Sequence, residues 1–144
     1  MSLRRWIAAA GAALMLSSGL IASAPPVAAD HHWKKWGATR APDQVLKDGC
    51  HRYRYHYRID VKNWAAEIFL VNPNGRTVAH DVIIDVTEPR RAWRRWSTEI
   101  CRASTTYGRH KIRMKITWSP DPDDPTPDNV EGFVKPSFFR FKRP

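Results

Sequence analysis

Two stretches of alternating residues constrain the fold of this chain more than any other feature. In the segment HRYRYHYRID and the residue after it, aromatic and apolar side chains occupy every second position: Tyr53, Tyr55, Tyr57, Ile59 and Val61. The positions between them are polar: Arg52, Arg54, His56, Arg58 and Asp60. Successive side chains of a β-strand point to opposite faces of the sheet. This pattern therefore predicts a strand whose tyrosines enter the core while its arginines face water.

The same segment could be taken for a surface that stacks on nucleic acid, because aromatic and basic residues are interleaved in it. Proteins that bind single-stranded nucleic acid expose their rings in the same groove as their cations. Alternation within a strand instead separates the rings from the guanidinium groups. Nucleic acid is therefore not a partner that this pattern favours.

The second alternating stretch covers residues 110–118, in which five positions share one face: His110, Ile112, Met114, Ile116 and Trp118. Weaker strand signals occur in four further segments: residues 65–71, 77–86, 97–103 and the surroundings of Phe139 and Phe141. Within residues 77–86 the spacing places Val82, Ile84 and Val86 on one side of the strand. Six or seven short strands with almost no helical periodicity predict an all-β, antiparallel sandwich.

Residues 1–29 are interpreted as a secretory signal peptide. Arg4 and Arg5 form a charged start, an apolar run extends over residues 7–21, and Val27-Ala28-Ala29 is a small-residue cleavage site. An uncleaved membrane anchor is the alternative, but two serines and a glycine interrupt the apolar run, and a spanning helix needs roughly 20 mostly apolar residues. The protein is predicted to be secreted or held at the cell surface, without stable membrane insertion after cleavage.

The remaining chain fits one domain of ordinary size. Residues 30–49 are expected to form a flexible leader with one short strand near Thr39 to Leu46, and residues 50–144 to form the sandwich. Cys50 and Cys101 are the only two cysteines. Since an exported chain meets an oxidising environment, a disulfide between them is the default expectation.

The resemblance of two segments to known proteins makes the fold expectation more specific. The segment from Ile100-Cys101-Arg102 through Tyr107-Gly108-Arg109 to Ile116 resembles the E-strand, tyrosine corner and F-strand of immunoglobulin-like domains. The segment that begins at Trp64 and reads WAAEIFLVNPNG is similar to uncharacterised secreted sandwich proteins of Gram-positive actinobacteria. The resemblance covers residues 50–118 and implies an immunoglobulin-like or fibronectin-like sandwich and an export route, but no reaction.

The chain departs from antibody domains in the position of its second cysteine. Cys101 precedes Tyr107, whereas the second cysteine of an antibody domain follows the corner tyrosine. If Cys50 begins strand B and Cys101 lies on strand E, the bond joins neighbouring strands of one sheet. It would not then pin two sheets together.

The charge of the chain suggests a class of partner. The signal peptide holds two of the 24 basic residues and none of the 14 acidic ones, so its removal lowers the formal net charge from +10 to +8. Such a charge attracts polyanions, but it also simply keeps a protein soluble. Composition alone leaves both interpretations open.

The connection before residue 97 is the strongest candidate for a binding surface. It crowds four arginines and two tryptophans: Arg90, Arg91, Trp93, Arg94, Arg95 and Trp96. Loops of a sandwich are frequent binding sites, Arg binds phosphate and sulfate in bidentate geometry, and exposed Trp stacks on sugars. We expect this segment to contact an anionic polysaccharide or cell-wall polymer. In the alternative, the tryptophans pack under the loop and the arginines are only solvated.

Metal binding is the competing hypothesis. Cleavage after Ala29 would place His at the third position of the new N-terminus, so that Asp30, His31 and His32 could chelate Cu(II) or Ni(II) in a square plane. The alternative is a polar leader without a ligand. The Pro- and Asp-rich loop at residues 119–136 invites a calcium interpretation, but EF-hand spacing is absent and a solvated hairpin loop is expected.

An enzyme is not predicted, and no cofactor is expected. His80-Asp81 and Asp85 could support acid–base chemistry only if they converge in a pocket, which spacing alone cannot show. The sequence contains no Gly-rich phosphate loop or nucleophile elbow. A membrane-active role is disfavoured because the chain after the signal lacks an amphipathic helix pattern.

Overall fold

The computed structural model describes residues 32–84, 91–121 and 129–144. These residues form nine strands: β1 (Gly37–Arg40), β2 (Gln44–Val45), β3 (Cys50–Ile59), β4 (Trp64–Val71), β5 (Thr77–Ile84), β6 (Arg94–Cys101), β7 (Gly108–Trp118), β8 (Val130–Phe133) and β9 (Ser137–Lys142). A single 3-10 turn, η1 (Arg102–Ser104), follows β6. Within the described ranges no helix is long and apolar enough to cross a membrane.

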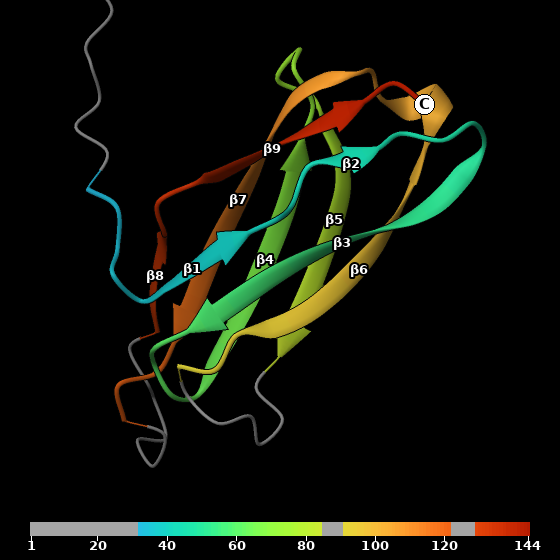
Figure 1. Cartoon of the computed structure of the whole chain (residues 1–144). Coiled ribbons are helices and arrows are strands. Elements are labelled where there is room, and N and C mark those ends of the chain that lie inside the picture. The colour runs from blue at the N-terminus through green and yellow to red at the C-terminus, as the bar shows by residue number, and fades with distance from the viewer. Residues whose placement is uncertain (1–31, 85–90, 122–128) are drawn as a thin grey trace, which may run out of the picture. The chain divides into compact units, whose positions relative to one another are not determined.

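The strands form two sheets, which Figure 1 shows as two layers. The first sheet has the order β1-β3-β6, and the second has the order β2-β9-β7-β4-β5 with β8 added to β7. All strand pairs are antiparallel except β2 with β9, which is parallel. The predicted all-β class is therefore confirmed. Nine strands are present where six or seven were expected, because the chain contains the short strands β1, β2 and β8.

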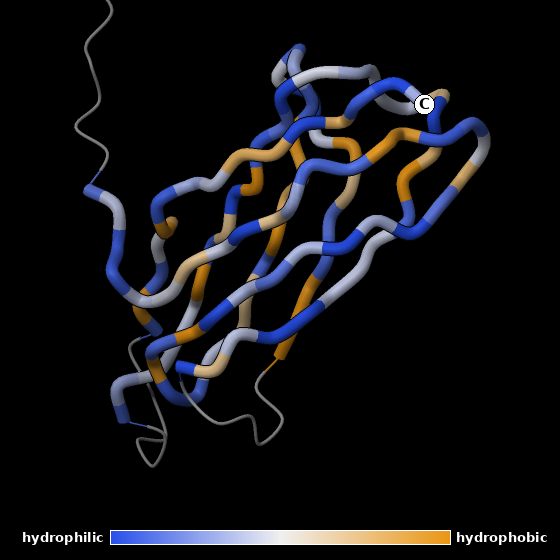
Figure 2. Tube along the Cα trace, viewed as in Figure 1, coloured by the Kyte–Doolittle hydropathy of each residue, from blue (hydrophilic) through white to orange (hydrophobic). Residues whose placement is uncertain are grey.

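The alternation in β3 places its tyrosines between the sheets, as predicted. Tyr53, Tyr55 and Tyr57 are at most 5% exposed, whereas the arginines at positions 52 and 54 are exposed. The ring of Tyr53 meets that of Phe141 in β9 edge to face, with 4.6 Å between centroids. In Figure 2, hydrophobic and hydrophilic positions follow one another along strands of the second sheet, such as β7.

In β5 the structure decides which side of the strand turns inward. Val82 and Ile84 are 57% and 62% exposed, and they face outward, whereas Ile83 is buried. In the β4–β5 ladder, Ile83 pairs with the buried Ala66, which places Ile83 on the inner face of the sheet. Val82 and Ile84 therefore share one side of the strand, as the spacing indicated, and that side faces outward. Val86 lies outside the described residues. Since positions 82–84 are all apolar, their spacing does not decide which side turns inward.

A partly buried hydrogen bond also holds β5 in this orientation. The Tyr55 hydroxyl donates to Asp81 Oδ2 across 2.9 Å, from the inner face of the first sheet to that of the second. Burial, together with the negative charge of Asp81, raises the pKa of the Tyr55 hydroxyl. The tyrosine therefore stays protonated and remains a donor to the carboxylate.

Two strand boundaries also differ from the expected ones. The single strand expected near residues 39–46 is split into β1 and β2, which belong to different sheets. The strand expected at residues 97–103 begins at Arg94 and ends at Cys101. Its early start is explained by a ladder in which Arg94, Arg95 and Trp96 pair with residues of β3.

The predicted disulfide between Cys50 and Cys101 is present. The two residues are directly paired in the β3–β6 ladder, with 3.9 Å between their Cα atoms. The bond therefore joins the beginning of β3 to the end of β6 within one sheet. Eight consecutive ladder pairs, from Cys50 to Tyr57, hold the same two strands together.

The core contains one fully buried histidine. His110 in β7 is 0% exposed, and its Nδ1 lies 3.1 Å from the Gly108 carbonyl oxygen. A carbonyl can only accept, so Nδ1 carries the proton of the neutral ring and Nε2 accepts from the Thr105 hydroxyl at 2.7 Å. Burial lowers the pKa of His110 below its ordinary value of 6.5, and the bond to Gly108 opposes this shift.

We expect His110 to make the stability of the protein pH-dependent. The His110 ring is neutral in the folded protein. Its contribution to the free energy of unfolding is therefore complete above about pH 6.5 and is lost as the pH falls through its lowered pKa. Urea unfolding of the wild type and of His110→Gln at pH 7.5 and pH 5.5 checks this. The difference in free energy of unfolding between the wild type and the variant should be smaller at pH 5.5 than at pH 7.5, by up to about 1.4 kcal/mol per pH unit. An unchanged gap would contradict the assignment.

Candidate functional site

The outer surface of the first sheet carries a cluster of basic side chains. Outward positions of β1, β3 and β6 supply five arginines, which we call the arginine face: Arg40, Arg52, Arg54, Arg58 and Arg95. His56 pairs with Arg40 on one side and with Arg95 on the other. These three form one row across three strands, about 10 Å long between its outer backbones.

One tryptophan of the predicted loop lies on this face. The guanidinium group of Arg40 is 4.2 Å from the centroid of the Trp93 ring, and that of Arg58 is 5.4 Å from it. Arg58 also forms an ion pair with Asp60 at 3.0 Å. Cation–π contacts of this kind hold guanidinium groups in place without neutralising them. Trp93 therefore helps to fix the positions of the Arg40 and Arg58 side chains on the arginine face.

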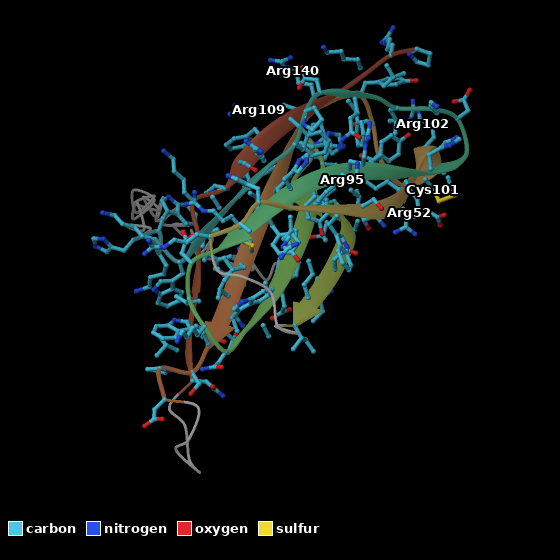
Figure 3. All side chains as sticks on the ribbon, turned by 60° about the horizontal axis from the view of Figure 1, so that its bottom comes forward. Arg52, Arg95, Cys101, Arg102, Arg109 and Arg140 are labelled. Atoms are coloured by element: carbon cyan, nitrogen blue, oxygen red, sulfur yellow. A yellow bond between two sulfur atoms is a disulfide. The ribbon has the colours of Figure 1, made fainter. Side chains whose placement is uncertain are left out.

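A hollow lies between β3 and β6 on the same surface. Its volume is about 500 Å³, and five residues line it: Arg52, Arg54, Arg95, Trp96 and Ser97. The guanidinium group of Arg52 donates to Ser97 Oγ at 3.1 Å and to the Ser97 carbonyl at 2.9 Å, which fixes its position. Figure 3 shows Arg52 and Arg95 over the ribbons of β3 and β6. The hollow thus offers three guanidinium groups beside an indole ring and a hydroxyl.

The arginine face has few acidic neighbours. Within the described part of the chain, Arg54 and Arg95 form no ion pair, and Glu99, opposite Arg52 in the ladder, is exposed. Arg40 and Arg95 flank His56 in the row, and Arg54 lies two residues from His56 on the same strand face. Their positive charges gather on one surface and attract anions to it. Guanidinium groups bind phosphate, sulfate and carboxylate with two parallel hydrogen bonds.

The structure separates the residues of the predicted binding segment. Trp93, Arg95 and Trp96 lie on or beside the arginine face. Arg94 is half-buried and pairs with Tyr57, whose ring is in the core. Arg91 is exposed in the turn before β6, with φ of 65°. Arg90 lies outside the described residues.

Four members of the arginine face were missing from the sequence-based site: Arg40, Arg52, Arg54 and Arg58. Three of them belong to the alternating segment in β3, whose outward positions were interpreted as merely solvated. Their alternation was the available signal. What it could not provide was the register with β6, which places Arg95 and the hollow beside them.

Of the residues in the two metal hypotheses, the structure describes His32 and part of the acidic stretch. Asp30 and His31 lie outside the described residues, and His32 is exposed. Of the acidic stretch, Glu131 lies in β8 and its carboxylate is 2.8 Å from Lys115 Nζ, a bond that raises the pKa of Lys115. In the described ranges, one group of potential ligands is compact enough for a metal ion: Cys50, Glu99 and Cys101. Its two sulfur atoms form the disulfide and are not free to ligate.

The candidate acid–base residues do not converge. His80 is on the outer face of β5, where its ring stacks on Phe69 and Nε2 lies 3.3 Å from Glu67. Asp81 points to the inner face and accepts the hydrogen bond from Tyr55. Asp85 lies outside the described residues. His80 and Asp81 therefore belong to opposite faces of the sheet.

No protein-family model, curated protein or solved structure matches this chain.

Proposed function

We propose that this protein is an exported, non-enzymatic binding module that uses the arginine face to hold an anionic polymer of the cell envelope or the extracellular space. The chemical group recognised is a phosphate or a sulfate repeated along the polymer. The proposal keeps Trp93, Arg95 and Trp96 from the predicted segment and adds the arginines of β1 and β3.

The row of Arg40, His56 and Arg95 carries the proposal. It is built by the ladders of three strands, so its spacing is set by the sheet and does not depend on a loop. Beside it the hollow adds Arg52 and Arg54. An extended surface with several cations at regular intervals matches a ligand with anions at regular intervals, which makes a polymer a better fit than a single small anion.

The placement of the rings supports a saccharide or wall polymer over nucleic acid. The tyrosines of β3 are buried and offer no stacking surface. Trp93 is already in contact with two guanidinium groups, and Trp96, which is 39% exposed, pairs with the buried Tyr55 and so lies on the side of β6 opposite to Arg95. Binding of single-stranded nucleic acid gains much of its energy from bases stacked on exposed rings. The arginine face has the cations for nucleic acid without that platform.

The strand order supports the immunoglobulin-like assignment that forms part of this proposal. The order β1-β3-β6 corresponds to strands A-B-E of such domains, and β9-β7-β4 corresponds to G-F-C. β5 then takes the place of strand C′ of the variable type. On this assignment the disulfide links strands B and E. Domains of this kind commonly act as extracellular binding modules, which agrees with the proposed export.

The charge of the arginine face is tested by the triple variant Arg52→Gln, Arg54→Gln, Arg95→Gln. We expect its retention on heparin and on immobilised polyphosphate to fall to a much lower elution salt. Removing three cationic contacts should also reduce the slope of log K against log salt by about 2. Salt-gradient elution and titrations at several salt concentrations measure both quantities.

A matched control removes the same number of positive charges from outside the arginine face. Lys35, Lys47 and Lys62 are exposed and lie outside the strands, so their triple glutamine variant should elute only slightly earlier than the wild type. Equal losses in both variants would mean that net charge alone governs retention, and the site would be refuted. Binding to single-stranded DNA with no binding to either polymer would instead identify nucleic acid as the partner and refute the proposal.

A further inference from the structure

The second sheet carries its own basic surface. Four exposed side chains occupy outward positions of β7 and β9, and we call them the β7 face: Arg109, Lys111, Arg113 and Arg140. Figure 3 shows Arg109 and Arg140 together over β7 and β9, apart from Arg52 and Arg95. On β7 the three cations stand at every second residue, about 7 Å apart along the strand.

Like charges also meet directly on this face. Arg109 and Arg140 are opposite each other in the β7–β9 ladder, an arrangement that is unfavourable unless an anion lies between or above them. Acidic groups near this face have other partners: Asp43 lies 3.3 Å from Lys142 and accepts a hydrogen bond from the backbone N–H of Arg140, and Lys115 lies between Glu131 and Glu67. Within the described ranges none of the four cations of the β7 face forms an ion pair.

Two aromatic rings hold the arginines of the β7 face in position. The guanidinium group of Arg109 lies 3.8 Å from the centroid of the Phe138 ring, and that of Arg113 lies 4.5 Å from the centroid of Phe133. Phe138 is 43% exposed. The face therefore repeats the composition of the arginine face, in which ordered guanidinium groups lie beside partly exposed aromatic rings.

The two basic faces point in opposite directions because the sheets share one core. Residues of β3 and β6 that face inward pack against inward residues of β4, β7 and β9, so the outward residues of the two sheets face away from each other. No linker or hinge is needed to separate them. A polymer bound along one face leaves the other face open to a second chain.

We propose that a single domain bridges two polyanion chains, one on the arginine face and one on the β7 face. This inference rests on the proposed function of the arginine face and extends it from attachment to cross-linking. The occupant of the β7 face is a polymer of the same chemistry, because the two faces offer the same groups. Bridging of this kind strengthens with the number of domains on a chain, since each additional attachment is intramolecular.

A two-layer binding experiment separates bridging from simple binding. Biotinylated polyphosphate is fixed to a streptavidin surface, the protein is bound to it and washed, and fluorescent polyphosphate is then added. The wild type should be retained in the first step and should capture polymer in the second. The variant Arg109→Gln, Lys111→Gln, Arg113→Gln should still be retained but should capture about tenfold less fluorescent polymer. Heparin in place of polyphosphate distinguishes sulfate from phosphate recognition.

The variants test different claims. The triple variant at Arg52, Arg54 and Arg95 can be retained in the first step through the β7 face, but it should capture about tenfold less polymer in the second. Capture by this variant equal to that of the wild type would refute the proposed function. Wild-type retention without capture of a second chain would refute bridging alone. Capture by the β7-face variant equal to that of the wild type would also refute it, because a self-associated protein or the arginine face would then explain the second layer. The triple variant at Lys35, Lys47 and Lys62 should behave as the wild type in both steps.

The variants must be folded for this comparison. The three substituted positions of the β7 face are exposed, so near-normal thermal unfolding is expected. If the triple variant fails to fold, the single charge reversal Lys111→Glu tests the same face. It should lower second-layer capture several-fold, and unchanged capture would overturn the proposal.

Discussion

Replacing Cys50 and Cys101 together by serine is expected to lower the free energy of unfolding by about 4 kcal/mol. The bond closes a loop whose ends are 51 residues apart in sequence, and in the chain-entropy model a loop of this length gives that value. Neither cysteine is in the core, and the β3–β6 ladder remains, so the folded state should be little changed. Most of the loss should come from a less constrained unfolded chain.

Chemical denaturation with and without a reducing agent measures this effect. The wild type in reductant should approach the stability of the double-serine variant, while the variant itself should be insensitive to reductant. Circular dichroism should show the same strand content in all folded samples. A loss below about 1 kcal/mol would show that the ladder, and not the covalent bond, constrains these strands in the unfolded chain.

Phe141→Ala is expected to lower the free energy of unfolding by about 3–5 kcal/mol, as large-to-small changes of buried aromatic residues do. Phe141 is 2% exposed, and its ring meets those of Tyr53, His110 and Phe139 at centroid distances of 4.6, 4.7 and 5.1 Å. The residue therefore joins the inner faces of both sheets. Its removal leaves a cavity where β3 and β9 pack together.

Phe138→Ala is the matched control for this prediction. Phe138 is on the same strand but on its outer face, is 43% exposed and contacts the guanidinium group of Arg109. Its truncation should cost at most about 1 kcal/mol, the value of an exposed cation–π contact. Urea unfolding of both variants measures the difference. Similar losses for Phe138 and Phe141 would contradict the assignment of inner and outer faces in β9.

The parts of the fold that were predictable from sequence are those in which one face of a strand is apolar and the other is polar. In β3 and β7 this contrast is complete, so the inward set could be read directly, and the burial of Tyr55 and Ile112 agrees with it. In β5 the run Val82-Ile83-Ile84 is apolar at consecutive positions. Only the pairing with β4 and the hydrogen bond to Asp81 decide its orientation.

The candidate site was less predictable because it depends on contacts between distant segments. The sequence located Arg95 and Trp93 in a connection and Arg54 in a strand, but it could not show that they share a surface. That placement follows from the β3–β6 register, in which His56 meets Arg95. The Cys50–Cys101 pair was a long-range clue to this register, since two bonded cysteines in adjacent antiparallel strands align the residues after Cys50 with those before Cys101.

The inward carboxylate of Asp81 has a consequence for how these molecules meet one another. β5 is at the end of the second sheet, and among the described residues it pairs only with β4. A terminal strand with exposed apolar side chains, here Val82 and Ile84, can pair edge to edge with a strand of another molecule and so start aggregation. A charge turned inward on such a strand discourages that growth, because an added strand would enclose it. Asp81 thus disfavours fibril-like assembly through this terminal strand.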